Sequence, residues 1–579
     1  ICACLVGSEM CIRDRYNIDI YNLFCSPCDM TDHNPILPED ARIVRIKDTE
    51  YVAIHKYWWD KEKKRGQQKR RYIGKLVDGK FVPNAAYAAE LKLTRVKKTT
   101  DKRQKFDHDK TFGTTALLTQ AAETSGLTDD LKKVYGEGKA AMMVSLAAYQ
   151  IIKNTTSQHR FKIFSDTNAL PAGLPDNIES QRLSELSQDI GSDTASLNRL
   201  FALRAKRLPE TEYLSFDSTR IASESRSLTD VRKGISKRGG YENQIGLALL
   251  YGHNSGVPLM FRRFAGNVPD IVTMHDLLTR WENIGVSKKI ISIFDRGYCS
   301  RENLRLLCKN KHHFIMAAKT DHSFIRDAIE DNLPAFWDMT NNVRGHNLTA
   351  VQTQVTIPGT KEDPKSCSVW VYIYYSLAVA NNEQDKFLSD LVTFEEDWIN
   401  GLASPDSKLL RFYETPDSEP GKKPLIRNND AVNEKVRYMG FFSMISDRKL
   451  ESKEILEIYR TRDCIEKCFG VIKTDVGFTT TRGHSDVSVN GRLLLAFIAA
   501  TIVSWLIKAM SVEVKIGKKS YAPLLDEYSL MELLEDVGQI RFYSSSTGKV
   551  WLGEILGRHR LVFERLGLEN CLLNPVMYK

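Results

Sequence analysis

One segment around residue 460 constrains the fold more than any other part of this sequence. It reads LESKEILEIYRTRDCIEKCFGVIKTD, in which Tyr459, Arg462, Glu466 and Lys473 follow at intervals of three, four and seven residues. On an α-helix, at roughly 100° per residue, these side chains fall within about 60° of arc and form one stripe. The adjoining arc holds four apolar residues: Ile458, Ile465, Phe469 and Ile472. The pattern predicts one long helix that buries its apolar face against a sheet.

The charged stripe has two interpretations. A carboxylate, two cations and a phenol at the edge of a buried face suit a functional site, because an ordinary solvated face points away from the core. The alternative is an amphipathic helix in which Arg462 and Glu466 form an incidental i,i+4 pair. Ser452 or Asp447 is the expected N-cap of this helix.

Two aspartates occupy matching places farther upstream. Asp217 lies within the predicted strand EYLSFDSTRIAS, and Asp295 follows the apolar run of KKIISIFDRGY. A carboxylate at the end of an apolar strand is costly unless it is paired, hydrogen-bonded or bound to a metal. Taken singly, each aspartate is more simply a cap or turn residue. The argument for a site rests on the set of three acids that they form with Glu466.

Asp217, Asp295 and Glu466 together make a hard, all-oxygen set of ligands. Such a set suits Mg²⁺ or Mn²⁺ and does not suit zinc. Two such ions about 3.5–4 Å apart can activate the attacking group and stabilise the leaving 3′-oxygen of a scissile phosphate. In-line phosphoryl transfer needs little else beyond positioning and charge neutralisation, and Arg462 and Lys473 would hold DNA phosphates beside the metal ions.

The motif Y-x2-R-x3-E-x6-K, present here as YRTRDCIEKCFGVIK, resembles a known signature. It is similar to the catalytic-helix motif of bacterial insertion-sequence DDE transposases, in the group that includes insertion sequence four. FDSTRIAS resembles the first-aspartate strand of that family, and FDRGYCS resembles its second-aspartate block. The resemblance covers about residues 210–310 and 436–510.

The resemblance implies an RNase H-like catalytic core that uses two divalent metal ions, Mg²⁺ or Mn²⁺. It implies double-stranded DNA as the partner, with a homodimer that holds two transposon ends in a synaptic complex. It assigns the role of catalytic metal ligand to three acids: Asp217, Asp295 and Glu466. It assigns DNA contacts to three further residues: Tyr459, Arg462 and Lys473.

The element pattern predicts an α/β fold. Residues 207–320 read as β-β-β-α-β-α-β, which suits a mixed sheet with flanking helices, and 436–510 resume that pattern. By the resemblance, these are the two parts of the RNase H-like core. Between them, 321–435 read as a β-rich insertion, because TAVQTQVTIP and SCSVWVYIYYSLAVA are strand-like. The resemblance implies that an aromatic residue of this insertion stacks on a flipped base, although core packing is the simpler role for each candidate: Trp337, Trp370 and Trp398.

The remaining segments have less specific patterns. Residues 1–15 contain MCIRDR, which resembles a translated sequencing adapter, so we interpret them as non-native. Residues 16–108 read as a basic β-rich module with an Asp-Gly turn. Residues 109–206 read as short helices, for which DNA-end binding and plain helical packing are equally open. A helical C-terminal region is expected from 511 to 579.

Charge and cysteine content narrow the class of protein. The net charge of the 579 residues is +9, and three basic runs, 61–71, 95–105 and 232–238, fit phosphate contacts, although each alone could be a solvated loop. Eleven cysteines, an odd number, indicate free thiols in a reducing compartment. Cys25 and Cys28 form a C-x-x-C without a second pair at zinc spacing, so we interpret them as non-ligands.

Other features of the sequence have ordinary interpretations. The apolar run 493–507 is shorter than the ~20 residues that cross a bilayer, which predicts a buried core helix. His253 and His275 are interpreted as structural histidines, since spacing fixes no partner for either. Small buried thiols are predicted at three positions near the acids: Cys299, Cys464 and Cys468.

These features predict a cytoplasmic, nucleoid-associated DNA transposase that makes no use of a membrane. The expected reactions are metal-dependent endonucleolytic cleavage at transposon ends and strand transfer into target DNA. Two alternatives remain: a nuclease with the same core that does not join DNA, and an inactive, element-derived DNA-binding protein.

Overall fold

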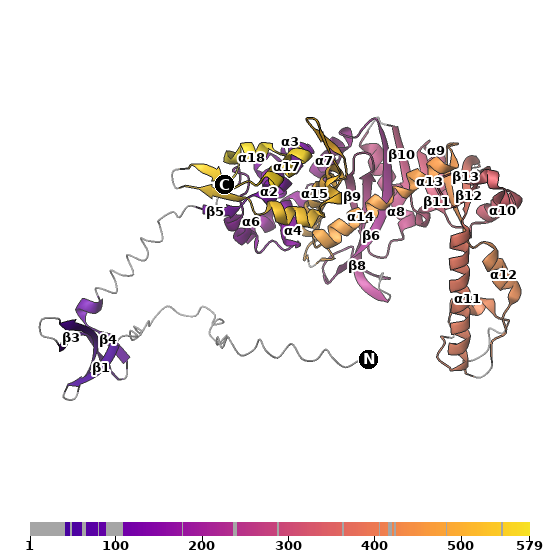
Figure 1. Ribbon diagram of the computed structural model, residues 1–579. Coiled ribbons are helices and arrows are strands. Elements are labelled where there is room, and N and C mark those ends of the chain that lie inside the picture. The colour runs from indigo at the N-terminus through magenta and orange to yellow at the C-terminus, as the bar shows by residue number, and fades with distance from the viewer. Residues whose placement is uncertain are drawn as a thin grey trace. The chain divides into compact units, whose positions relative to one another are not determined.

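The computed structural model describes residues 41–46, 49–60, 65–78, 80–88, 108–175, 178–235, 240–285, 289–361, 364–404, 406–414, 420–421, 424–481, 483–545 and 548–579. The chain divides into two compact units, Ile1–Phe106 and Asp107–Lys579 (Figure 1). The predictions for residues 1–15, for Cys25 and Cys28, and for the basic run 95–105 lie outside the described residues.

The first unit contains a four-stranded antiparallel sheet. Its strands lie in sequence order: β1 (Ala41–Ile46), β2 (Thr49–Asp60), β3 (Arg65–Val77) and β4 (Lys80–Pro83). Val52, Ile73 and Phe81 form its small core. Asp78, with a positive φ of 51°, lies between β3 and β4, where an Asp-Gly turn is predicted. β2 and β3 pair as far as Asp60 and Arg65, well beyond this core.

A ten-stranded mixed sheet organises the described part of the second unit. The order is β12-β13-β14-β11-β10-β6-β8-β7, with β15 beside β6 and β9 beside β8. Its strands are β6 (Thr211–Ser223), β7 (Arg232–Ile235), β8 (Tyr241–Gly252), β9 (Val257–Ala265), β10 (Lys289–Phe294), β11 (His313–Ala318), β12 (Thr349–Ile357), β13 (Cys367–Tyr375), β14 (Phe441–Ser446) and β15 (Thr480–Thr481). β6, β10 and β11 are parallel to one another, and β8 and β14 run antiparallel to them.

The strands and helices of residues 207–320 follow the predicted order. Helix α8 (Asp270–Asn283) follows β9, and α9 (Arg301–Lys309) follows β10. Ser300 caps α9, because its side chain accepts a hydrogen bond from the N–H of Asn303 at 3.1 Å. One strand was not predicted: β7 contains the start of the basic run 232–238 and pairs with β8.

The prediction of a β-rich insertion at 321–435 is wrong. Both strands of this stretch, β12 and β13, extend the main sheet. The rest of its regular structure is largely helical: α10 (Ser323–Asp331), α11 (Leu377–Ile399) and α12 (Asn429–Arg437). Ser376 marks the change, since its side chain accepts a hydrogen bond from Val379 N–H and caps α11 directly after β13. α11 and α12 share a separate apolar cluster and project from the sheet (Figure 1).

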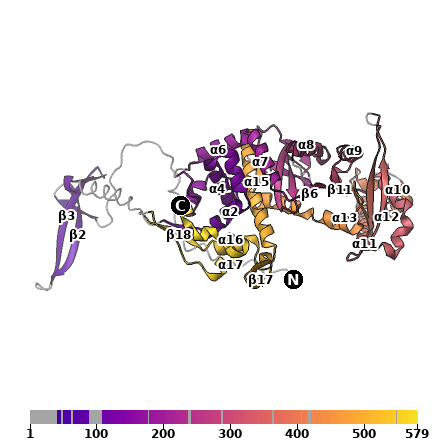
Figure 2. The ribbon, with the colours of Figure 1, turned by 90° about the horizontal axis from the view of Figure 1, so that it is seen from above.

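Helices from both ends of the second unit pack around α15 (Asp486–Met510), as Figure 2 shows. From the beginning of the unit come α2 (Gly113–Thr124), α3 (Leu127–Tyr135), α4 (Glu137–Lys153), α5 (Phe161–Thr167), α6 (Ser180–Ser192) and α7 (Thr194–Lys206), and from its end comes α17 (Gly557–Leu566). α15 and α6 cross closely, because a Cβ on Gly491 would lie 1.9 Å from the Ser187 carbonyl oxygen. Although α15 is long and apolar enough to cross a membrane, 78% of its most apolar window is buried inside the protein.

The C-terminal region is mixed and not only helical. It contains β16 (Val514–Ile516), β17 (Lys519–Tyr521), α16 (Leu530–Val537), β18 (Arg541–Ser544), β19 (Val550–Leu552), α17 (Gly557–Leu566) and α18 (Asn570–Leu573). β18 pairs with β19 and with β5 (His108–Thr111), the first strand of the unit. The backbones of Leu170 and Lys579 also exchange hydrogen bonds of 3.1 and 2.8 Å. This region therefore packs back onto the helices of 109–206.

Candidate active site

Asp217 and Asp295 lie side by side because of the register of two parallel strands. Phe216 of β6 pairs with Phe294 of β10, and their rings stack with centroids 4.7 Å apart. The aspartate is the next residue after each phenylalanine, so the parallel register places Asp217 and Asp295 next to each other. Their side chains are 18% and 35% exposed, respectively, which leaves them open to a ligand.

The predicted long helix is broken into three segments. α13 (Ser452–Arg460) and α14 (Asp463–Gly470) are separated at Thr461 and Arg462, and a π-helical turn, Val471–Asp475, follows α14. The predicted caps are also wrong, since Glu451 occupies the N-cap position of α13. Asp447 instead accepts a hydrogen bond from the N–H of Phe314 at 2.9 Å and so joins β14 to β11.

The guanidinium of Arg462 lies among all three acids. Its Nη1 is 3.3 Å from Asp217 Oδ2, and its Nη2 is 3.7 Å from Asp295 Oδ1 and 2.5 Å from Glu466 Oε1. Burial opposes the charge on this side chain, but the neighbouring acidic groups together raise the pKa of Arg462. A permanent cation therefore occupies the point where acids from β6, from the end of β10 and from α14 converge.

Tyr459, at the end of α13, points to the second aspartate. Its hydroxyl donates a hydrogen bond to Asp295 Oδ1 over 3.2 Å. Burial, and then the charge of Asp295, raises the pKa of the Tyr459 hydroxyl, so it stays protonated and remains a donor. Tyr459 therefore orients the Asp295 carboxylate from the side of the helix.

Glu466 and Lys473 complete the predicted stripe in different ways. Glu466 lies in the first turn of α14, where the helix dipole favours an anion, and its side chain is 55% exposed. The ammonium of Lys473 lies 2.7 Å from both Thr219 Oγ1 and the Arg220 carbonyl oxygen of β6. The structure thus brings Tyr459, Arg462 and Glu466 to the aspartates, whereas Lys473 is hydrogen-bonded to the strand that carries Asp217.

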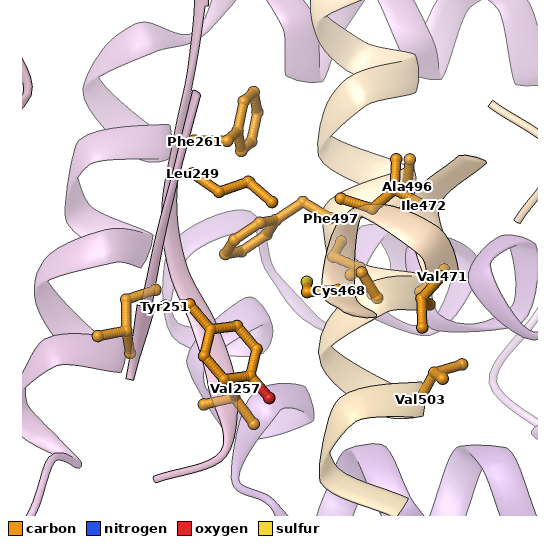
Figure 3. Packing of buried hydrophobic residues seen from close by; sticks show 14 of the residues in the cluster. Leu249, Tyr251, Val257, Phe261, Cys468, Val471, Ile472, Ala496, Phe497 and Val503 are labelled. Atoms are coloured by element: carbon orange, nitrogen blue, oxygen red, sulfur yellow. The ribbon is translucent and has the colours of Figure 1, made fainter. Parts of the chain in front are cut away.

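Apolar packing holds the acid-bearing helix in place. In Figure 3, Cys468 of α14 lies beside Phe497 of α15, and Val471 and Ile472 of the π-helical turn belong to the same buried cluster. Phe497 in turn contacts Phe261 of β9, with ring centroids 5.3 Å apart. The segment that carries Glu466 therefore packs between α15 and the sheet that carries Asp217.

Comparison with known proteins places this chain in a family. The model of the transposase DDE domain matches residues 209–502, which is just over half of the chain and contains all three acids. The chain is a member of the DDE transposase family. Among solved structures, a piggyBac transposase in a synaptic complex with hairpin DNA matches 78% of this chain and 74% of its own, at 9% identity and a TM-score of 0.31. No curated protein matches the chain.

The chemistry of the acid set in this transposase fits divalent metal ions, on which the family in general depends. Three carboxylates provide only oxygen donors, the type that Mg²⁺ and Mn²⁺ prefer. Within the residues that the structure describes, no three His, Cys, Asp or Glu side chains form a closed metal-binding cluster. At this site the Arg462 guanidinium lies between the three acids and offsets part of their negative charge.

His253, interpreted from the sequence as a structural histidine, lies near the candidate site and has partners there that the sequence did not reveal. It follows β8, and its ring nitrogens contact Ser215 Oγ of β6 at 2.6 Å and Thr461 Oγ1 at the break before α14. The only signal in the sequence is its place between a predicted strand and the turn residues NSG. The other histidine interpreted as structural, His275, is exposed on α8.

Cysteines near the transposase site are packing residues. Cys299 and Cys468 are buried, as predicted, and Cys464 is partly buried. Burial raises the pKa of each of these three thiols to about 12, so they stay protonated and unreactive at neutral pH.

The three tryptophans of the insertion have different surroundings. Trp398 is fully buried in the cluster between α11 and α12, which confirms a packing role for it. Trp370 of β13 lies beneath the ammonium of Lys449, 5.0 Å from the ring centroid. Trp337 is 60% exposed, and its ring meets that of Tyr375 edge-on with centroids 5.0 Å apart.

Proposed function

We propose that this transposase cuts DNA at the ends of a mobile element and joins those ends to target DNA. The observation that carries the proposal is the convergence of Asp217, Asp295 and Glu466 on Arg462. Acids from two parallel strands and one helix meet at a single point of the family's domain, and a solvent-exposed side of that point admits a phosphate backbone. The finer assignments follow the motif: an insertion sequence four-like element, an RNase H-like core and a homodimeric synaptic complex.

Asp217, Asp295 and Glu466 would hold the divalent ions, Mg²⁺ or Mn²⁺. Bound there, two ions would supply the charge that activates the attacking oxygen and stabilises the leaving 3′-oxygen. Tyr459 keeps Asp295 oriented by its hydrogen bond, and α14 presents Glu466 from its first turn. When metal ions bind the acids, Arg462 would lose its ion pairs with the three carboxylates. Its guanidinium would then form an ion pair with a phosphate of the bound DNA.

A long hairpin of the first unit provides a candidate surface for DNA. Tyr57, Trp58 and Trp59 near the end of β2 are 61%, 49% and 66% exposed. Exposed cations lie near them on the same hairpin: Lys56, Arg65, Lys69 and Arg70. Exposed aromatic rings among cations suit base stacking beside phosphate contacts. We propose that this hairpin contacts DNA, and that the helices of 109–206 add to end binding.

A plasmid assay tests the proposed chemistry. Purified protein and Asp295→Ala are incubated with supercoiled plasmid that carries an element end, in Mg²⁺, Mn²⁺ or EDTA. The proposal predicts metal-dependent nicking and joined products with the wild type only. Nicking by Asp295→Ala at the wild-type rate would refute the assignment of the site.

The same assay separates the two alternative functions. Cleavage without joined products, under conditions with excess target DNA, would identify a nuclease that lacks strand transfer. Salt-sensitive DNA binding without cleavage of a substrate that carries both element ends would identify an inactive DNA-binding protein.

A further inference from the structure

His253 stands on a rigid part of the backbone. Its N–H donates to the Tyr213 carbonyl over 2.9 Å, which extends the pairing of β8 with β6 by one residue. The buried carboxylate of Glu212 then accepts hydrogen bonds from the N–H groups of Asn254 at 2.6 Å and Ser255 at 2.8 Å. The turn after β8 is therefore tied to β6, and the imidazole projects from a fixed base.

The ring joins two hydroxyl groups that come from different elements. Nε2 lies 2.6 Å from Ser215 Oγ, and Nδ1 is hydrogen-bonded to Thr461 Oγ1. The Thr461 hydroxyl itself donates to the Ile458 carbonyl over 2.6 Å, so its oxygen must accept from the Nδ1–H of His253. Nε2 is then the acceptor for the Ser215 hydroxyl. All three hydrogen bonds thus run in one direction, from β6 to α13.

Both ends of this chain of hydrogen bonds adjoin the candidate active site. Ser215 precedes Asp217 by two residues on β6, so the two side chains project from the same face of the strand. Thr461 lies in the break before α14, next to Arg462, and α14 carries Glu466 in its first turn. The position of Thr461 relative to β6 therefore determines how far Glu466 lies from Asp217.

We propose that His253 is a positioning residue of the active site, which fixes the start of α14, and with it Glu466, relative to the strand that carries Asp217. This inference rests on the proposed metal-binding function of these acids. His253 acts through Ser215 and Thr461, and it links the sheet to the break before the start of α14.

The protonation state of the ring agrees with this role. Burial lowers the pKa of His253 to about 4, so the ring is neutral at physiological pH. A neutral imidazole has one donor nitrogen and one acceptor nitrogen, which is the pair that Thr461 and Ser215 require.

A Mn²⁺ titration of the full chain tests the proposal without any knowledge of the DNA sequence bound. Free Mn²⁺ is measured by its paramagnetic resonance signal for wild type and for His253→Phe, which keeps a flat ring but loses both hydrogen bonds. Loss of a residue that orients metal ligands typically weakens metal binding or activity 10–100-fold, and we expect about that loss here. The matched control is His275→Phe, since His275 is exposed on α8 and its side chain makes no hydrogen bond in the described part of the chain. Wild-type Mn²⁺ affinity in His253→Phe would overturn the proposal.

Two substitutions at Thr461 distinguish a positioning role from a simple folding defect. Thr461→Ser keeps the hydroxyl, so its Mn²⁺ affinity should stay within about threefold of wild type. Thr461→Val loses the hydroxyl and should bind Mn²⁺ as weakly as His253→Phe does. A role limited to stability would lower the melting temperature of the valine variant and leave its Mn²⁺ affinity unchanged. That result would also overturn the proposal.

Variants of the acids separate this inference from the proposed function. Asp217→Asn and Glu466→Gln should lose Mn²⁺ binding in the same titration. If both retain it, the metal site itself is wrong, and the proposed function fails together with the role of His253. If both lose it and His253→Phe does not, only the positioning role fails.

Discussion

Arg462 and Asp217 lie 245 positions apart in the sequence, yet guanidinium Nη1 and carboxylate Oδ2 are 3.3 Å apart in the fold. The same guanidinium contacts Glu466 and Asp295. One cation therefore lies between the three acids, and under the proposed function divalent ions would compete with the arginine for these carboxylates.

Replacement of Arg462 by Met should strengthen Mn²⁺ binding by the DNA-free protein about tenfold, because the acids lose a competing positive charge. The measurement is the Mn²⁺ titration described above. Arg460→Met is the matched control, since Arg460 lies two residues earlier and contacts His346 at 2.9 Å. Weaker binding by Arg462→Met would show that the guanidinium holds the acids in place and does not compete for them.

Glu466→Gln should abolish DNA cleavage, with a loss of roughly 1000-fold or more, while the protein remains folded. Glu466 is 55% exposed, so the loss of its ion pair with Arg462 should cost no more than about 1 kcal/mol of stability. Plasmid cleavage and calorimetry give the two quantities. Glu457→Gln, another exposed carboxylate of the same segment, should cleave normally. Cleavage at a wild-type rate by Glu466→Gln would exclude this residue from the site.

Lys473→Met distinguishes a structural lysine from a DNA contact. The ammonium donates two hydrogen bonds of 2.7 Å to β6, so its removal should destabilise the fold by about 1–3 kcal/mol. Thermal denaturation measures that loss. If Lys473 also neutralises a phosphate, the salt dependence of DNA binding should decrease by about one ion, and an unchanged dependence would restrict its role to the fold.

Trp59→Ala should weaken DNA binding by roughly 5- to 100-fold, because the loss of one base-stacking ring costs about 1–3 kcal/mol. Fluorescence anisotropy with duplex and single-stranded oligonucleotides measures the affinity and shows which form the hairpin prefers. Val77→Ala is the control, as Val77 is an exposed apolar residue of β3 outside the aromatic tip. Equal affinity for Trp59→Ala and wild type would exclude the ring from the interface.

The melting temperature should depend on pH through His253. Its pKa in the folded protein is about 4, below the ordinary value of about 6.5. At a pH between these two values, the unfolded chain therefore binds more protons than the folded protein does. The stabilising contribution is complete above about pH 6.5 and is lost as the pH falls towards 4. Calorimetry across this range should show a smaller decrease for His253→Phe than for wild type. His275→Phe should behave as the wild type does.

The core elements of this fold could be predicted from local patterns, but the insertion could not. Alternation and flanking turns predict the strands that carry Asp217 and precede Asp295. In the insertion, the apolar strand β13 continues without a turn signal into α11, and Ser376 alone separates them. The pairing of β5 with β18 joins residues far apart in the chain, and no local pattern contains that information.

The site was predicted as a set of residues and not as a geometry. Spacing on a regular helix put Tyr459, Arg462, Glu466 and Lys473 on one stripe, but the helix breaks at Thr461, and Lys473 itself lies in a π-helical turn. Both irregularities are fixed by contacts with β6 and with the turn that carries His253. A period of 3.6 residues cannot encode such contacts, because they depend on segments more than 200 residues away.

The sheet of β5, β18 and β19 has a consequence for how the protein is made. β5 acquires its partner only after about 430 further residues have left the ribosome, because Thr111 meets Arg541. The helices that follow β5 likewise cannot bury their apolar faces until α15 has been synthesised. The helical region therefore cannot complete its folding before the ten-stranded sheet has been synthesised, and a chain interrupted anywhere before β18 should be recognised by proteases as an unfinished protein.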